Sequence, residues 1–201
     1  MHLEIADGHV ELDRPRNASA LLLLTHGAGG GVDTVDLLAI RDAAVEAGVA
    51  VARVLQPYRV AGRKTPPQPG PQDTAWLEIV AGLRRRRGLG RVPLVLGGRS
   101  NGARVACRTA QATGAVGVVA LAFPLHPPGR PDKTRLPELD AAGVPTLVVQ
   151  GDRDPFGMPP TGPLREVVVI EGADHSLKKQ LSVTAATVTA FVTGLTSAAL
   201  T

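Results

Sequence analysis

The chain has 201 residues, of which 44% are hydrophobic and 2% aromatic, and its 22 basic and 18 acidic side chains leave a net charge of +4. This length suffices to bury one sizeable core, so we expect a single domain over residues 1–201 with an aliphatic core. The small basic excess and the scarcity of aromatic rings for base stacking exclude a typical nucleic-acid-binding protein.

Cys107 is the single cysteine, which excludes an internal disulfide and a zinc site built from several cysteines. Both exclusions fit a reducing compartment. The first residues lack the basic start and apolar stretch of a signal peptide, and no apolar run is long enough to span a bilayer. The sequence therefore predicts a cytoplasmic protein without a membrane partner.

Short apolar runs alternate with longer stretches of helical period, a pattern typical of successive strand and helix units. Residues 2–13 are expected to add an antiparallel strand or hairpin at one edge. The pattern predicts a mostly parallel, twisted sheet of six to eight strands with helices on both faces. The runs expected to form buried strands are, in chain order, residues 20–25, 49–55, 92–97, 116–123, 146–150 and 166–170.

Four helices are expected between or after these strands. The first two begin near Asp33 and Asp73, and we expect the Asp33 carboxylate to cap free backbone amides. The first helix ends at Gly48. The third follows Ser100 directly, and the last starts at Ser182. Their expected core-facing residues recur at helical spacing: Leu37, Ile40, Ala44 and Ala47; Trp76, Ile79, Val80 and Leu83; Val105, Ala106 and Ala110; and Val188, Phe191, Val192 and Leu195.

Charge and proline content describe the remaining segments. The basic run 84–87 falls at the end of the second helix, where the helix dipole is negative, so we expect a solvated helix end rather than an anion site. Prolines interrupt residues 56–72 and 124–145, so neither stretch is expected to form a long regular element. The second stretch is also too short for a lid domain, which predicts an open, shallow site.

The segment Gly98-Arg99-Ser100-Asn101-Gly102 is a complete G-x-S-x-G between an expected strand and an expected helix. The turn is so sharp that side chains two positions either side of the serine would collide, and glycine removes them. The hydroxyl would stand at a helix N-terminus, which favours developing negative charge. Ser100 is therefore expected to be a nucleophile; the alternative is a serine that only caps the helix.

A glycine-rich loop, residues 26–31, follows the first buried strand. Its glycines let the backbone approach a ligand, so the amide of Ala28 is expected to bind an oxyanion together with the amide of Asn101. The alternative is a phosphate-binding loop, although neither G-x-G-x-x-G nor a P-loop lysine is present. His26, at the start of the loop, is expected to fix its shape rather than act as a base.

An acid and a histidine follow the last two strands. Asp154 lies in the segment Gln-Gly-Asp-Arg-Asp-Pro and His175 in the segment Gly-Ala-Asp-His-Ser. Strand carboxyl ends gather the functional groups of open α/β sheets, and the order serine, acid, histidine suits a triad. Asp154 has left the strand and can turn toward His175, whereas Asp152 is closer to the strand end; Asp152 and Asp174 remain alternatives.

These motifs together resemble those of small bacterial α/β-hydrolases distantly related to dienelactone hydrolase. Their order is also similar to that in the hydrolase-like domain of a regulatory subunit of a nuclear histone acetyltransferase complex. The resemblance runs from about residue 20 to the C-terminus and implies an α/β-hydrolase fold without a lid domain, with a triad of Ser100, Asp154 and His175. The segments that carry it are residues 26–29, 97–102, 123–129, 151–157 and 174–176.

Two positions depart from these families. Dienelactone hydrolases proper usually carry cysteine where Ser100 stands, which argues against that activity, and Asn101 replaces a frequent methionine. His126 also follows a strand end, but we expect it to fix local shape or face solvent. Cys107 is expected to be a small buried hydrophobe.

The sequence thus predicts a serine hydrolase that cleaves a small to medium ester or thioester through an acyl-enzyme, without a metal or organic cofactor. The expected partner is a small acyl substrate. The alternative is a catalytically idle hydrolase fold that binds a protein or ligand. Neither the natural substrate nor the oligomeric state is predicted.

Overall fold

One eight-stranded sheet forms the centre of the fold, in a computed structural model that describes residues 1–198. The strand order is β1-β2-β4-β3-β5-β6-β7-β8. The strands from β3 onward are parallel, whereas β1 and β2 form a hairpin that joins β4 antiparallel. The strands are β1 (His2–Ile5), β2 (Gly8–Asp13), β3 (Leu21–Thr25), β4 (Ala50–Leu55), β5 (Leu94–Arg99), β6 (Gly117–Leu121), β7 (Thr146–Gly151) and β8 (Arg165–Ile170).

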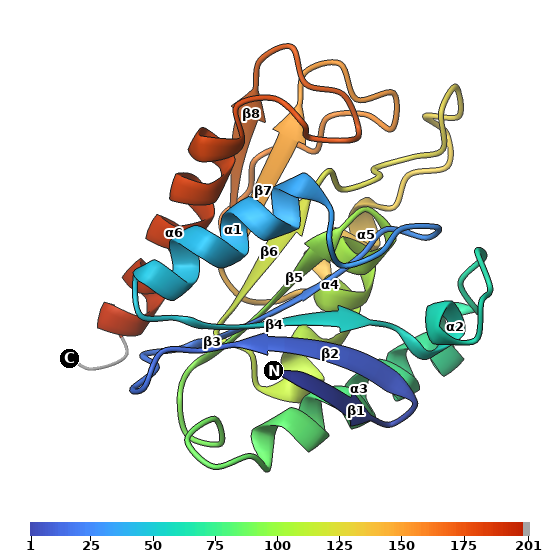
Figure 1. The fold of residues 1–201 in the computed structure, drawn as a ribbon. Helices are drawn as coiled ribbons and strands as arrows, with labels where there is room; N and C mark the ends of the chain where they lie inside the picture. Colours follow the sequence, from blue (N-terminus) through green and yellow to red (C-terminus); the bar gives the residue numbers. More distant parts are fainter. Residues whose placement is uncertain (199–201) are drawn as a thin grey trace.

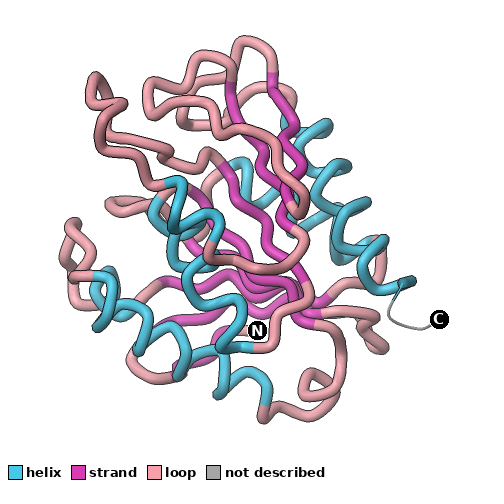
Figure 2. Tube along the Cα trace, turned by 180° about the vertical axis from the view of Figure 1, so that it is seen from behind, coloured by secondary structure: helices cyan, strands magenta, loops and turns pink. Residues whose placement is uncertain are grey.

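Helices cover both faces of the sheet (Figure 1). The helices α1 and α6 lie together on one face, and α3, α4 and α5 cover the other, which Figure 2 shows from behind. None of the helices within residues 1–198 combines the length and apolar character needed to cross a membrane. The helices are α1 (Val35–Glu46), α2 (Pro57–Val60), α3 (Pro69–Arg84), α4 (Asn101–Thr113), α5 (Leu136–Asp140) and α6 (Leu181–Ala198).

The sheet separates two aliphatic cores because side chains alternate along each strand. In β3, Leu21 and Leu23 pack toward α3 and α4, whereas Leu22 and Leu24 pack toward α1 and α6. All four leucines are fully buried. A strand covered on both faces reads as a continuous apolar run, which is why the central strands were recognisable in the sequence.

The mostly parallel sheet, the edge hairpin and the four expected helices are confirmed. The strand boundaries lie within two residues of the expected ones. The largest differences are in β5, which is Leu94–Arg99 rather than residues 92–97, and in β6, which ends at Leu121 rather than at Phe123. Ala122 has a positive φ of 45°, which turns the chain out of the strand. The proline-rich stretches hold only short additional elements, α2 and α5.

The two aspartates expected at helix starts pair with arginines instead. The N-cap of α1 is Thr34, and the Asp33 carboxylate instead pairs with Arg53, 2.5 Å from its Nη1. Helix α3 begins at Pro69, one turn before Asp73, because proline is well suited to the first helical position. At the other end of α1, Ala47 is exposed rather than in the core.

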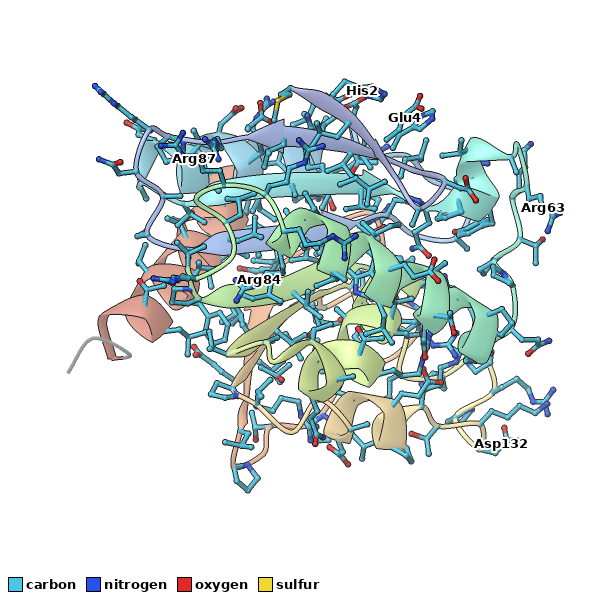
Figure 3. All side chains as sticks on the ribbon, turned by 90° about the horizontal axis from the view of Figure 1, so that it is seen from below. His2, Glu4, Arg63, Arg84, Arg87 and Asp132 are labelled. Carbon is cyan, nitrogen blue, oxygen red and sulfur yellow. The ribbon has the colours of Figure 1, made fainter. Side chains whose placement is uncertain are left out.

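The basic run after α3 lies far from the carboxyl ends of the parallel strands. Figure 3 shows Arg84 and Arg87 at the opposite end of the molecule from Arg63 and Asp132, which belong to the loops after α2 and β6. The side chain of Arg84 donates to two backbone carbonyl oxygens of its own connecting loop. These features support a solvated helix end, as the sequence predicts.

A network of ion pairs ties the three helices of one face together. Arg108 on α4 makes a bidentate contact with Asp73 on α3 and a further 2.8 Å bond to Glu138 on α5. Arg104, one turn earlier, binds Glu138 through two more bonds of 2.9 and 2.7 Å. Only 13% of the Arg108 side chain is exposed, so solvent screens this network less than a surface ion pair.

We expect Arg108→Met to lower the free energy of unfolding by roughly 2 kcal/mol, because it leaves Asp73 half-buried without its cation. Urea unfolding at neutral pH measures the change. Arg86→Met is the matched control, since Arg86 is exposed just beyond α3. Equal unfolding midpoints for the two variants would show that the network does not stabilise the fold.

Candidate active site

Ser100 stands between β5 and α4 in a backbone conformation that residues with side chains rarely adopt. Its φ is 53° and its ψ is −113°, and it is the N-cap of α4. Its own N–H donates to the carbonyl oxygen of Leu121 at the end of β6, 2.9 Å away. Such strain typically costs about 1–3 kcal/mol and persists only where surrounding contacts enforce it.

The glycines two positions either side of Ser100 enforce this turn, as the sequence predicts. A Cβ on Gly98 would lie 2.7 Å from the backbone carbon of Gly102 and 2.8 Å from the carbonyl oxygen of Thr25. A Cβ on Gly102 would lie 2.7 Å from that same oxygen. Because the obstacles are backbone atoms, no side-chain movement could relieve them.

Three polar side chains, from the ends of β5, β7 and β8, form one hydrogen-bond chain. The Oγ of Ser100 lies 2.9 Å from Nε2 of His175, and Nδ1 of His175 lies 2.8 Å from Oδ2 of Asp154. An ionised carboxylate only accepts hydrogen bonds, so Nδ1 carries the ring proton and Nε2 is free to accept the serine proton. This is the arrangement of a nucleophile, a base and an orienting acid.

The carboxylate of Asp154 is fully buried and receives three donors. Besides His175, the amide Nε2 of Gln150 donates to Oδ2 at 2.9 Å, and the backbone N–H of Phe156 donates to Oδ1 at 2.9 Å. Gln150 also donates to the carbonyl oxygen of Gly157 at 2.8 Å. These contacts hold the acid loop against the end of β7 and fix the direction of the carboxylate.

His175 is held from two further sides. The ring of Phe156 lies against its imidazole, with ring centroids 4.2 Å apart and planes tilted by 32°. The guanidinium of Arg99, the residue before the serine, donates from Nη2 to the His175 carbonyl oxygen at 2.8 Å. Nε of Arg99 lies 3.5 Å from the buried carboxylate of Asp36 in α1. Arg99 thereby joins the serine turn, the histidine loop and α1.

The loop after β3 is shaped by His26, as the sequence predicts. Its Nδ1 lies 2.8 Å from the carbonyl oxygen of Gly27, and its Nε2 accepts the backbone N–H of Gln56 at 3.1 Å. The ring is therefore neutral, with the proton on Nδ1. Burial is the main cause that lowers its pKa from 6.5 to about 4; nearby Arg59 acts in the same direction and the bond to Gly27 opposes it.

Helix α2 holds the same loop from its outer side. The hydroxyl of Tyr58 donates to the carbonyl oxygen of Ala28 at 2.7 Å, and Nε of Arg59 donates to that of Gly30 at 2.9 Å. With both carbonyls engaged in these bonds, the peptide groups of the loop have fixed orientations. A short helix that the sequence analysis did not expect therefore sets the shape of this loop.

Of the two amides expected to bind an oxyanion, that of Asn101 follows Ser100 directly, and that of Ala28 belongs to the loop after β3. A Cβ built on Gly27 would lie 3.4 Å from the Cβ of Ser100, so this loop passes directly beside the serine. The N–H of Ala28 donates to no other backbone group within residues 1–198. Asn101 is the first residue of α4, and the first four amides of a helix have no partner within it.

The other polar candidates lie outside this chain of hydrogen bonds. Asp152 is exposed, and Asp174 is exposed with its carboxylate bound to the N–H and hydroxyl of Ser176. His126 lies near the acid loop, where its backbone N–H donates to the carbonyl oxygen of Phe156. Cys107 is fully buried, and burial raises the pKa of its thiol to about 12, as suits a small hydrophobe.

Sequence reasoning missed Arg99, Gln150 and Phe156 as supporting residues. Only Gln150 carried a usable signal, because it is a buried polar residue at the end of an otherwise apolar strand. A buried amide in such a place must find hydrogen-bond partners, and the adjacent acid loop supplies them. Phe156 and Arg99 act through contacts between segments far apart in the chain.

The buried, neutral His26 makes stability depend on pH. In the unfolded chain its pKa is 6.5, whereas in the folded chain it is about 4, so between these values only the unfolded state binds the proton. Its contribution to the free energy of unfolding is complete above pH 6.5 and is lost as the pH falls to 4, by roughly 3 kcal/mol in total. We expect the His26 ring protons to titrate near pH 4 in an NMR experiment.

The matched variant for this effect is His26→Gln, which does not titrate. Its free energy of unfolding, measured in urea, should change less between pH 7 and pH 4.5 than that of the parent protein. The two proteins are compared by how steeply the free energy of unfolding changes with pH, not by its absolute value. The variant loses the hydrogen bonds of His26 at every pH, so its absolute free energy of unfolding is lower throughout. A ring that titrates near pH 6.5 in the folded protein would contradict the assignment.

Comparisons with known proteins agree with this architecture. Est1E from Butyrivibrio proteoclasticus has a similar structure, with a TM-score of 0.75 and 16% identity over 98% of each chain. A dienelactone hydrolase from Anabaena variabilis gives a TM-score of 0.73 at 17% identity, covering 94% of this chain and 93% of its own. At such identities the likeness establishes the fold alone.

A protein from Xanthomonas campestris, described as an α/β serine hydrolase without a lid, gives a TM-score of 0.71 at 18% identity. The match covers 92% of this chain and 90% of that one. A search of curated proteins found no match. Residues 18–193, however, match the model of the family described as "Alpha/beta hydrolase domain". Since that match extends over most of the sequence, the chain belongs to the α/β-hydrolase domain family.

Proposed function

We propose that this protein is a serine hydrolase that cleaves a small to medium ester or thioester through an acyl-enzyme. The single observation that carries the proposal is the unbroken hydrogen-bond chain from Ser100 to His175 to Asp154, with contacts of 2.9 and 2.8 Å. A serine that only capped a helix would not need a histidine ring nitrogen within hydrogen-bond distance of its hydroxyl. The strained turn that presents Ser100 supports the same conclusion.

In the first half of the reaction, Oγ of Ser100 attacks the carbonyl carbon while its proton passes to Nε2 of His175. The carbonyl electron pair moves onto the oxygen, and the amides of Ala28 and Asn101 bind the resulting oxyanion. Asp154 balances the charge on the imidazolium. The bond to the leaving alcohol or thiol then breaks, and that group takes the proton from His175.

In the second half, His175 removes a proton from water as the water oxygen attacks the acyl-serine ester. A second oxyanion forms at the same two amides and collapses, which releases the acid and returns the proton to Ser100. The reaction needs no group beyond those in the chain and water. Removing one oxyanion donor typically costs about 3 kcal/mol of transition-state stabilisation, so these amides add substantially to the contribution of the side chains.

The proposal of a small to medium substrate is based on the segment between β6 and β7. Residues 122–145 contain only the short helix α5, which packs against α4 rather than forming a cover over Ser100. The Xanthomonas structure, described as lidless, has the same general fold. A site without a lid suits small to medium acyl groups. Est1E is also known with ferulic acid bound, which makes a feruloyl ester a reasonable test substrate.

The alternative is a catalytically idle member of the fold that binds a protein or ligand. It rests on the fact that one fold hosts many functions. The expected likeness to the regulatory subunit of a histone acetyltransferase complex is not found among the curated proteins. The intact hydrogen-bond chain favours the enzyme. We further propose a small acyl substrate rather than a nucleic acid as partner, and the cytoplasm as the location.

A serine-directed fluorophosphonate probe separates the two proposals. We expect folded protein to be labelled at Ser100, because His175 activates that hydroxyl, and Ser100→Ala to remain unlabelled. Ser176→Ala is the matched control and should label as the parent does, since the Ser176 hydroxyl is bound to Asp174. If the parent stays unlabelled while a known serine esterase reacts, the enzyme proposal fails.

The acid is tested by two isosteric changes. Asp154→Asn should lower kcat for p-nitrophenyl esters by about 100- to 10,000-fold, because the wrong histidine tautomer would be favoured. Asp152→Asn, at an exposed carboxylate, should leave kcat within about two-fold. The reverse pattern would assign the acid to Asp152.

A panel of p-nitrophenyl esters, acyl thioesters and methyl ferulate, with Ser100→Ala as blank, then ranks substrates.

A further inference from the structure

The outward face of the edge hairpin carries four ionisable side chains in two facing pairs. In the β1–β2 register, His2 lies opposite Glu11 and Glu4 lies opposite His9. Residues two apart on a strand point to the same face, so all four side chains share one surface. The intervening residues Val10 and Leu12 are buried in the core, which confirms that this surface is the solvent side.

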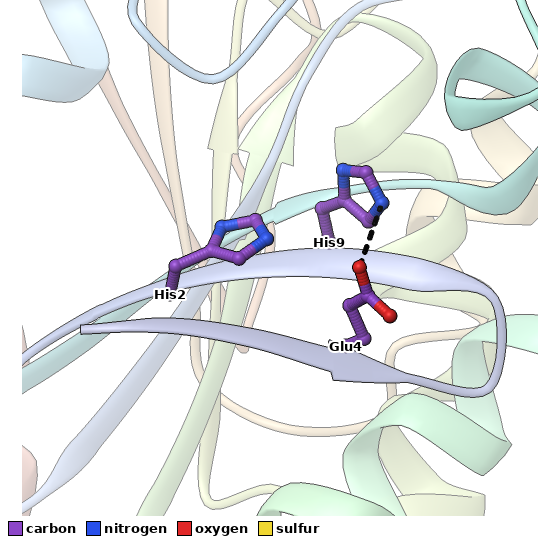
Figure 4. A group of neighbouring side chains, drawn as sticks. All are labelled: His2, Glu4 and His9. Carbon is purple, nitrogen blue, oxygen red and sulfur yellow. Dashed lines mark ion pairs between the residues drawn. The ribbon is translucent and has the colours of Figure 1, made fainter.

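Three of these side chains bring ligand atoms together. His2, Glu4 and His9 each offer one ring nitrogen or carboxylate oxygen, and these atoms all lie within 4.8 Å of one another. Figure 4 shows the three side chains side by side on the hairpin, with the ion pair between Nε2 of His9 and Oε1 of Glu4 at 3.9 Å. Bonds of 2.0–2.2 Å to one ion would bring these atoms closer together, and His2 and Glu4 are exposed side chains that can rotate toward it.

The fourth side chain, that of Glu11, orients the imidazole of His2. Nδ1 of His2 lies 2.8 Å from Oε1 of Glu11, and a carboxylate can only accept that bond. Nδ1 therefore carries a proton, and Nε2 is the ring nitrogen of His2 that is left to bind a ligand. Histidines that bind metals usually donate their other ring nitrogen to a carboxylate or carbonyl in this way.

We propose that the hairpin binds a divalent transition-metal ion of the zinc class through His2, Glu4 and His9, with Glu11 orienting His2. Two imidazoles and one carboxylate are a ligand set that zinc accepts, whereas calcium and magnesium prefer oxygen ligands alone. Water completes the coordination. A cavity of about 440 Å³, lined by Glu4, Ala6, Asp7, His9 and Val60, opens beside the ligands and gives that position access to small molecules.

This site is separate from the hydrolytic one. The hairpin occupies the β1 edge of the sheet, whereas Ser100 follows the central strand β5. The ion takes no part in the reaction proposed above. Its physical effect is to join β1 to β2, and β1 pairs with no other strand of the described sheet. Since the ion binds the folded hairpin and not the unfolded chain, it stabilises the folded protein.

The test is calorimetric titration of tag-free protein with zinc chloride in a non-coordinating buffer, followed by thermal unfolding with and without zinc. We expect one ion bound per chain and a rise in the unfolding temperature. His2→Gln and His9→Gln should each weaken binding by at least ten-fold. Glu11→Gln should keep one site with affinity reduced by about ten-fold, which reports its orienting role. Magnesium chloride should produce neither effect.

His126→Gln is the matched control, because His126 lies by the acid loop and is not part of the hairpin. It should bind zinc as the parent does. The variants change exposed or half-exposed side chains, and their unfolding temperatures without zinc show whether each one folds. Absence of binding to the parent, or unchanged binding to the His2→Gln/His9→Gln double variant, would overturn the proposal.

Discussion

The structure depends on one steric constraint, the close contact among β5, α4 and the end of β3. Gly98 and Gly102 approach each other and the Thr25 carbonyl so closely that neither position has room for a Cβ. This contact forces Ser100 into its positive φ, and its hydroxyl lies within hydrogen-bond distance of His175. The loop after β3 passes beside the serine, since a Cβ built on Gly27 would lie 3.4 Å from that of Ser100.

The acid side of the site is built on a different principle, that buried polar groups must be satisfied. Asp154 is fully buried, and its carboxylate accepts from His175, Gln150 and the backbone of Phe156. The three donors come from the end of β7, the loop after β7 and the loop after β8. The carboxylate therefore organises the polypeptide around it as much as it orients the histidine.

The sequence predicted those features in which chemistry demands a residue type at a fixed spacing. The glycines around Ser100, the continuous apolar strands and the late Asp154 and His175 are of this kind. The sequence-based predictions failed where one residue can take several structural roles. Asp33 and Asp73 are good helix caps, yet each pairs with an arginine instead, Arg53 and Arg108. Those partners lie 20 and 35 residues away in the chain, and only the fold determines that they meet.

The strand order determines how a substrate would lie at Ser100. The glycine loop follows β3 on one side of β5, whereas the acid and histidine loops follow β7 and β8 on the other. If Ser100 attacks a carbonyl, its oxygen must point toward β3 and its leaving group toward His175. The loop held by α2 then borders the carbonyl oxygen, and the loops after β7 and β8 border the leaving group. Stabilisation of the oxyanion and recognition of the leaving group would thus reside in separate segments that can diverge independently.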